Sequence, residues 1–224
     1  MLDLYFDIEC IPTGSPSDVE MPEITAPGNY KDPKKIAEYI EKKEIEQDAS
    51  RDKLFRDRCF DALTGEIISI AWAIGDDAIQ TTGCWNLSRE FDLIQDFFDR
   101  VVFGYPTHKR LFVRWIGHNI LKFDLPYLWQ RCVLLNIKPP FLIPKNARSG
   151  GDHVFDTMIE WGNQYDKSTW KSQSVLAKAF GLEPQETGGA DVYDQWLAKD
   201  YEAIRTHNIL DVEEVRILHK RMML

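Results

Sequence analysis

Four acidic side chains stand where they could bind metal ions together: Asp7, Glu9, Asp124 and Asp211. Asp7 and Glu9 lie two residues apart in LDLYFDIE, whose apolar residues alternate as in a β-strand, so both point to one face near its C-terminal end. At ~4 Å and an effective dielectric constant near 20, two carboxylates repel by about 4 kcal/mol. Such a pair fits either a cation site or an exposed, solvated strand end.

The other two acids belong to predicted helices. Asp124 follows one predicted strand and begins a helix, where it is either an ordinary N-cap or a ligand. Asp211 lies in the inward stripe of the last helix, where an unpaired carboxylate costs several kcal/mol and needs a hydrogen-bond network or a metal. His207, one turn earlier, shares its face and is either structural or catalytic. The stripe consists of Ile204, Asn208, Asp211, Val215, Leu218 and Met222.

Together, these acids form the set that a two-metal phosphodiester site requires. Two divalent ions about 3.5–4 Å apart activate an attacking water and stabilise the leaving 3′ oxygen. Oxygen ligands without cysteine or a pair of ligand histidines favour Mg²⁺ or Mn²⁺ over zinc. We therefore expect two ions of this kind.

Three segments resemble the motifs of the DEDD superfamily of 3′–5′ exonucleases, which have the ribonuclease H-like fold. They are FDIE (6–9), HNILKFD (118–124) and HNILDVEE (207–214), in the family's order and within residues 2–216. The resemblance is closest to the proofreading exonuclease domains of family B DNA polymerases and their stand-alone relatives. It implies a 3′–5′ exonuclease that hydrolyses phosphodiester bonds from the 3′ end of single-stranded DNA and releases nucleoside monophosphates.

The resemblance also implies roles for single residues. Asp7, Glu9 and Asp211 would contact the metals directly, and Asp124 would act mainly on the second metal, in part through water. The family uses as general base either a Tyr four residues before the last Asp or a His five before it. Here His207 lies four before Asp211. Four helical residues leave about 40° of rotation and five leave about 140°, so we interpret the site as the Tyr-type architecture with a catalytic His.

Substrate contacts follow from the same resemblance. Asn119 and Phe123 would line the terminal nucleotide, and the backbone near Ile8 and Cys10 would approach its base or sugar. Asp156, in VFDTM, is usually structural in the family. The first four residues are the predicted substrate-binding residues, and Asp156 is expected to support the structure around them.

The elements that must position these residues suggest an α/β protein. We predict strands at 2–9, 66–75, 78–85 and 111–117, and helices at 91–101, from 124, and at about 154–162, 171–181 and 200–222. This order predicts a mixed central β-sheet flanked by helices, in one domain over 1–224. A charged helical insertion at about 16–60, starting its helix at Asp32-Pro33, fits a solvated flanking helix pair or a lid over substrate.

Composition limits the kind of nucleic-acid binding and the cellular location that can be expected. The 224 residues carry a formal net charge of −9, which opposes tight sequence-independent duplex binding but not the gripping of a few nucleotides at a strand end. Four scattered cysteines, no signal-peptide pattern and no long apolar run predict a cytoplasmic protein without membrane contact.

The expected partner is a single-stranded nucleic acid 3′ end, with DNA favoured over RNA. Because no polymerase follows in the chain, a polymerase or a replication or repair partner would act in trans. An exoribonuclease is the first alternative, since no identified residue reads the 2′-hydroxyl. A catalytically inactive nucleic-acid-binding module on the same fold is the second.

Overall fold

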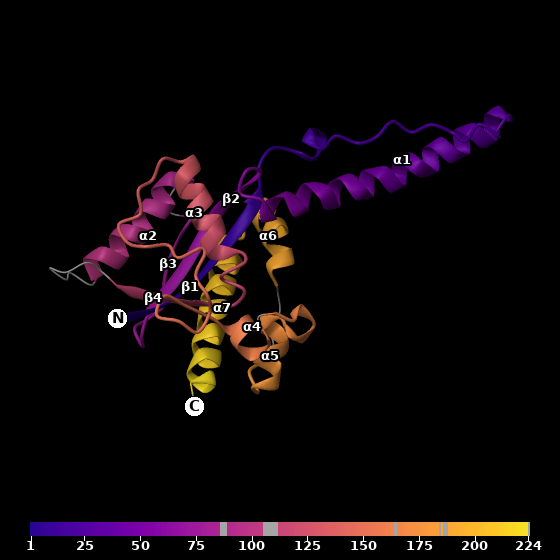
Figure 1. The fold of residues 1–224 in the computed structure, drawn as a ribbon. Coiled ribbons are helices and arrows are strands. Elements are labelled where there is room, and N and C mark those ends of the chain that lie inside the picture. Colours follow the sequence, from indigo (N-terminus) through magenta and orange to yellow (C-terminus); the bar gives the residue numbers. More distant parts are fainter. Residues whose placement is uncertain (86–88, 105–111, 164, 184, 186–187, 224) are drawn as a thin grey trace. The chain divides into compact units, whose positions relative to one another are not determined.

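A computed structural model describes residues 1–85, 89–104, 112–163, 165–183, 185 and 188–223 (Figure 1). The chain forms two compact units, one made of residues 1–10 with 66–224 and the other of residues 11–65. All the predicted site residues belong to the first unit. The insertion predicted at about 16–60 lies within the second.

A five-stranded mixed sheet with the order β3-β2-β1-β4-β5 forms the centre of the first unit. β2 and β3 are antiparallel, whereas β1–β4 and β4–β5 are parallel, with Leu2 opposite Val113 and Trp115 opposite Val154. The predicted mixed sheet is therefore confirmed. The strands are β1 (Leu2–Pro12), β2 (Gly65–Ile74), β3 (Gln80–Gly83), β4 (Val113–Gly117) and β5 (Val154–Asp156).

Helices cover both faces of the sheet, and two differ from the prediction. The helix predicted at 154–162 is wrong in its first three residues, because Val154 and Phe155 are buried and pair with β4 as β5. α6 was not predicted at all. The helices are α2 (Glu90–Gly104), α3 (Asp124–Leu134), α4 (Thr157–Trp161), α5 (Gln173–Ala179), α6 (Val192–Ala198) and α7 (Tyr201–Met222).

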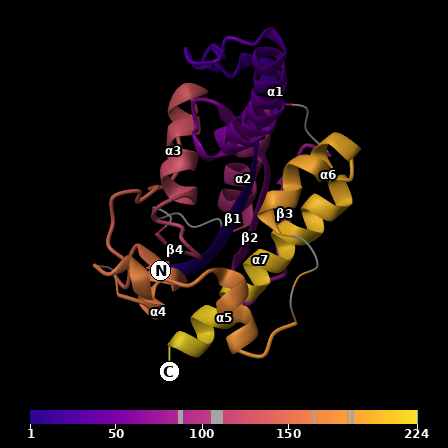
Figure 2. The same cartoon turned by 90° about the vertical axis from the view of Figure 1, so that its right-hand side faces the viewer.

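Alternation along β1 divides the core between the two faces of the sheet. Phe6 points toward α2, where its ring meets Phe97 at 5.2 Å between centroids. Tyr5 points the other way and packs with Val212 and Val215 of α7. Figures 1 and 2 accordingly show α2 and α7 on opposite sides of the sheet. The same alternation puts Asp7 on the face that α7 covers.

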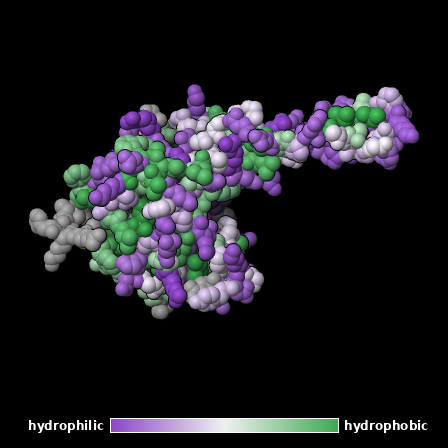
Figure 3. All heavy atoms as spheres, turned by 45° about the horizontal axis from the view of Figure 1, so that its top comes forward, coloured by the Kyte–Doolittle hydropathy of each residue, from purple (hydrophilic) through white to green (hydrophobic). Residues whose placement is uncertain are grey.

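The second unit contains one long charged helix, α1 (Pro33–Arg56), flanked by short 3-10 turns at Pro16–Asp18 and Asp57–Phe60. The helix starts as predicted, with the Asp32 side chain accepting a hydrogen bond from the backbone N–H of Lys34. The predicted helix pair is wrong, because α1 runs unbroken for 24 residues. Figure 3 shows hydrophilic side chains along it, with a hydrophobic patch among them. Among the described residues, no helix has the length and apolar character to cross a membrane.

His219 of α7 forms a buried polar cluster away from the predicted site. Its Nδ1 lies 2.9 Å from the Tyr5 hydroxyl, its ring packs edge-on against Phe155, and Arg114 approaches its Nε2. Burial, helped by the Arg114 charge, lowers the pKa of His219 to about 4. Protonating this imidazole is therefore unfavourable in the folded protein.

We expect His219 to make folding stability depend on pH. An unfolded histidine titrates near 6.5. The contribution is therefore fully present above about 6.5 and is lost as pH falls toward 4, by on the order of 3 kcal/mol. In denaturant titrations, His219→Gln should reduce the loss of unfolding free energy across this window. An unchanged pH dependence would show that His219 titrates alike in both states.

Candidate metal-binding active site

Asp7 is held in place by a buried amide. Its Oδ2 accepts a hydrogen bond of 2.6 Å from Nδ2 of Asn208 on α7. Oδ1 of that amide accepts a hydrogen bond of 2.6 Å from Ser69 of β2. Asn208 and Ser69 are fully buried, so the amide is fixed with its NH₂ group toward the carboxylate. Sequence reasoning placed Asn208 on the inward stripe but missed this role.

Asp124 connects the start of α3 to β1. The N-cap of α3 is Phe123, so Asp124 is the first helical residue and the N-cap alternative is wrong. Its buried Oδ1 accepts a hydrogen bond of 3.2 Å from the backbone N–H of Ile8. This contact joins the first and second predicted motifs directly.

The loop that leads to Asp124 depends on a second buried acid, Asp156. Its two oxygens accept hydrogen bonds from the backbone N–H groups of Asn119 at 2.9 Å and Leu121 at 3.1 Å. Asn119 has a φ of 58°, a left-handed conformation that Asn tolerates better than most residues. Asp156 thus supports the loop in a structural role and keeps Asn119 beside the site.

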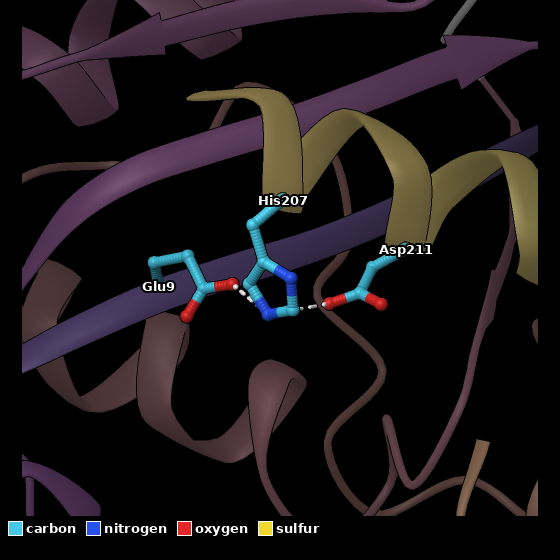
Figure 4. Close-up of side chains that lie close together, drawn as sticks. All are labelled: Glu9, His207 and Asp211. Atoms are coloured by element: carbon cyan, nitrogen blue, oxygen red, sulfur yellow. Dashed lines mark ion pairs between the residues drawn. The ribbon is translucent and has the colours of Figure 1, made fainter. Parts of the chain in front are cut away.

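His207 lies between two carboxylates (Figure 4). Its Nε2 is 3.5 Å from Oε1 of Glu9 on β1 and 3.3 Å from Oδ2 of Asp211, one turn further along α7. One ligand atom from each of the three residues lies within 4.8 Å of the others, so this cluster could hold a metal ion. Two carboxylates and one imidazole form a donor set that suits a divalent cation.

Two glutamine side chains hold Asp211. Gln173, the first residue of α5, donates from Nε2 to Oδ1 of Asp211 at 2.8 Å and to the nearby carboxylate of Glu214. Gln185 donates from Nε2 to the same Oδ1 at 2.8 Å, and its Oε1 lies 2.7 Å from Nδ1 of His207. Neither glutamine was predicted, because no local pattern links them to α7.

The four acids strongly disfavour their own charged forms when no cation is bound. Burial, and then repulsion from Asp211 and Asp124, raises the pKa of Asp7 and of Glu9 well above the ordinary value. Burial also raises the pKa of Asp124 to about 7 and raises that of Asp211. A bound divalent cation would reverse this effect by favouring the ionised carboxylates.

These residues line one cavity of about 450 Å³. Gln173, Gln185 and Glu214 also contribute to its wall. Cys10 is not among its lining residues, whereas the other predicted site residues are. They are Asp7, Ile8, Glu9, Asn119, Phe123, Asp124, His207 and Asp211.

The chain is similar in structure to a family B DNA polymerase from the hyperthermophilic archaeon Pyrobaculum calidifontis. The fold is ribonuclease H-like. The TM-score is 0.55 at 15% sequence identity, and the match covers 99% of this chain but only 24% of the polymerase. No protein-family model and no curated protein sequence matches the chain.

Proposed function

We propose that the protein is a metal-dependent 3′–5′ exonuclease that shortens single-stranded nucleic acid, with DNA favoured. The observation that carries the proposal is the convergence of four carboxylates from β1, α3 and α7 in one cavity. Three of them raise the pKa of Asp7, which is a costly arrangement for a protein that binds no cation. The order of the three motifs and the fold shared with a DNA polymerase support the same function.

The donor set fits two divalent cations. Asp7, Glu9 and Asp211 would contact the ions directly, and Asp124 would act mainly on the second. Mg²⁺ or Mn²⁺ suits such carboxylate oxygens. When bound, such ions activate the attacking water and stabilise the leaving 3′ oxygen.

The surrounding residues would bind and orient the strand end. Asn119 and Phe123 line the cavity beside Asp124, so they can contact the sugar and the base of the terminal nucleotide. Nε2 of His207 faces the acids and is the atom that would accept a proton from the attacking water. Asn208 would hold the carboxylate of Asp7, and Gln173 that of Asp211, in the same position throughout the reaction.

Incubation with 5′-labelled single-stranded DNA and Mg²⁺ or Mn²⁺ should give a ladder that shortens from the 3′ end, with mononucleotides as product. A paired end should react more slowly, since unstacking it costs a few kcal/mol. A covalently closed single-stranded circle is the matched control and should resist. Circular and linear strands cut at equal rates would contradict an exonuclease.

An RNA of the same sequence in this assay separates the two substrate classes. Faster loss of RNA than of DNA would favour the exoribonuclease alternative. Strand binding without cleavage of either substrate, at saturating Mn²⁺, would instead favour an inactive binding module. A polymerase or repair partner acting in trans is part of the proposal and can be tested by adding a primed template.

A further inference from the structure

The amide of Gln185 bridges His207 and Asp211, and its orientation is fixed by neighbouring groups. Nε2 of Gln173 lies 3.2 Å from the backbone oxygen of Asp211, which can only accept. The NH₂ group of Gln173 therefore faces Asp211 and also donates to Oδ1 of its carboxylate. Oδ1 is thus an acceptor, whatever the protonation of the other oxygen.

The acceptor role of Oδ1 of Asp211 also determines which nitrogen of the His207 ring carries a proton. Because Oδ1 of Asp211 accepts, the group of Gln185 that faces it at 2.8 Å is the NH₂. Oε1 of Gln185 then faces Nδ1 of His207 at 2.7 Å, so Nδ1 must carry the proton of this hydrogen bond. In a neutral ring, Nε2 is left with its lone pair. Nε2 is the atom between Glu9 and Asp211.

We propose that Gln185 is a positioning residue that sets the tautomer and direction of the His207 ring, so that Nε2 is the proton acceptor in the reaction. The inference rests on the proposed function for what Nε2 does, but its structural part is independent of activity. Because His207 is 6% exposed, water cannot easily replace the Gln185 oxygen at Nδ1. Loss of a residue that hydrogen-bonds to a side chain of the active site, without touching the substrate or metal itself, typically lowers activity or metal affinity by 10–100-fold.

The first test compares Gln185→Met, which keeps the side-chain length but removes both hydrogen bonds, in two backgrounds. With His207 present, turnover should fall by about 10–100-fold with KM little changed. In the His207→Ala background, the same substitution should cost much less, because only its hydrogen bond to Asp211 is then lost.

Gln173→Met is the matched control, since Gln173 holds Asp211 and Glu214 and, within the described part of the chain, forms no hydrogen bond with His207. Its effect should be similar in both His207 backgrounds. Turnover of Gln185→Met within twofold of wild type would overturn the inference. An equal loss with and without His207 would also overturn it.

A second test needs neither substrate nor metal. In ¹⁵N NMR spectra of the metal-free protein at mildly alkaline pH, the His207 ring should carry its proton on Nδ1. The signal is identified by its loss in His207→Ala. Gln185→Met should shift the ring toward the Nε2–H tautomer, whereas Gln173→Met should not. An Nε2–H ring in the wild type overturns the inference; a wild type that cuts no substrate overturns the proposed function instead.

Discussion

Asp7→Asn should lower the nuclease rate by about 10³-fold or more at saturating Mn²⁺, because the amide lacks the negative charge that would help to hold the cations. The same change should raise the melting temperature of the metal-free protein. Burial and three neighbouring carboxylates raise the pKa of Asp7, so its charge destabilises the folded state at neutral pH. Relief of even ~1 kcal/mol raises the melting temperature of a chain this size by about 2–4 °C.

The matched control is Asp3→Asn, the same substitution four residues earlier on β1. Asp3 lies outside the cavity and forms a bidentate ion pair with Arg114, with N–O distances of 2.8 and 2.9 Å. Its replacement should lower the melting temperature and keep the nuclease rate. The two variants therefore have opposite effects on the melting temperature, and only Asp7→Asn lowers the nuclease rate.

Thermal melting with and without Mn²⁺ completes the experiment. The cation should stabilise the wild type and Asp3→Asn, and should stabilise Asp7→Asn far less. Chelation should abolish activity and leave the fold intact. A metal-free Asp7→Asn that melts well below wild type would show that Asp7 is a structural residue, and full activity in that variant would refute the mechanism.

Periodicity explains why much of the site could be predicted from the sequence. Alternation along β1 places Asp7 opposite Phe6, on the sheet face that packs against α7. A spacing of four residues places His207 and Asp211 on one side of α7, where they meet Glu9. Local spacing is sufficient for these residues because each lies within a long regular element.

The parts that were missed depend on contacts between distant segments. β5 is three residues long and is stabilised by its pairing with β4, so Val154–Asp156 has no periodic pattern of its own. Gln173 and Gln185 reach α7 from segments 38 and 26 residues away. A glutamine outside a long helix or strand has no periodic pattern around it, so a single sequence does not indicate its role. Here, both glutamines hold the carboxylate of Asp211.

His207→Ala should lower turnover by roughly 10²–10⁴-fold, the usual range for loss of a general base. Nε2 of this side chain lies 3.3–3.5 Å from the carboxylates that would hold the cation, so it would be close to a water activated there. An ordinary imidazole accepts protons near neutral pH, which a phenol does not do readily. Substrate binding should change much less than turnover.

The competing explanation is that His207 only neutralises and packs against Glu9 and Asp211. Single-turnover rates at saturating Mn²⁺, measured from about pH 6 to 9, separate the two roles. For a base, His207→Tyr should recover part of the loss, because the exonuclease family whose motifs this sequence resembles has a Tyr at the same helical position. His219→Gln is the control on the same helix and should leave the rate unchanged near neutral pH. If His207→Ala kept a rate within a few fold of wild type with the same pH profile, His207 would have no catalytic role, and the four acids alone would account for the activity.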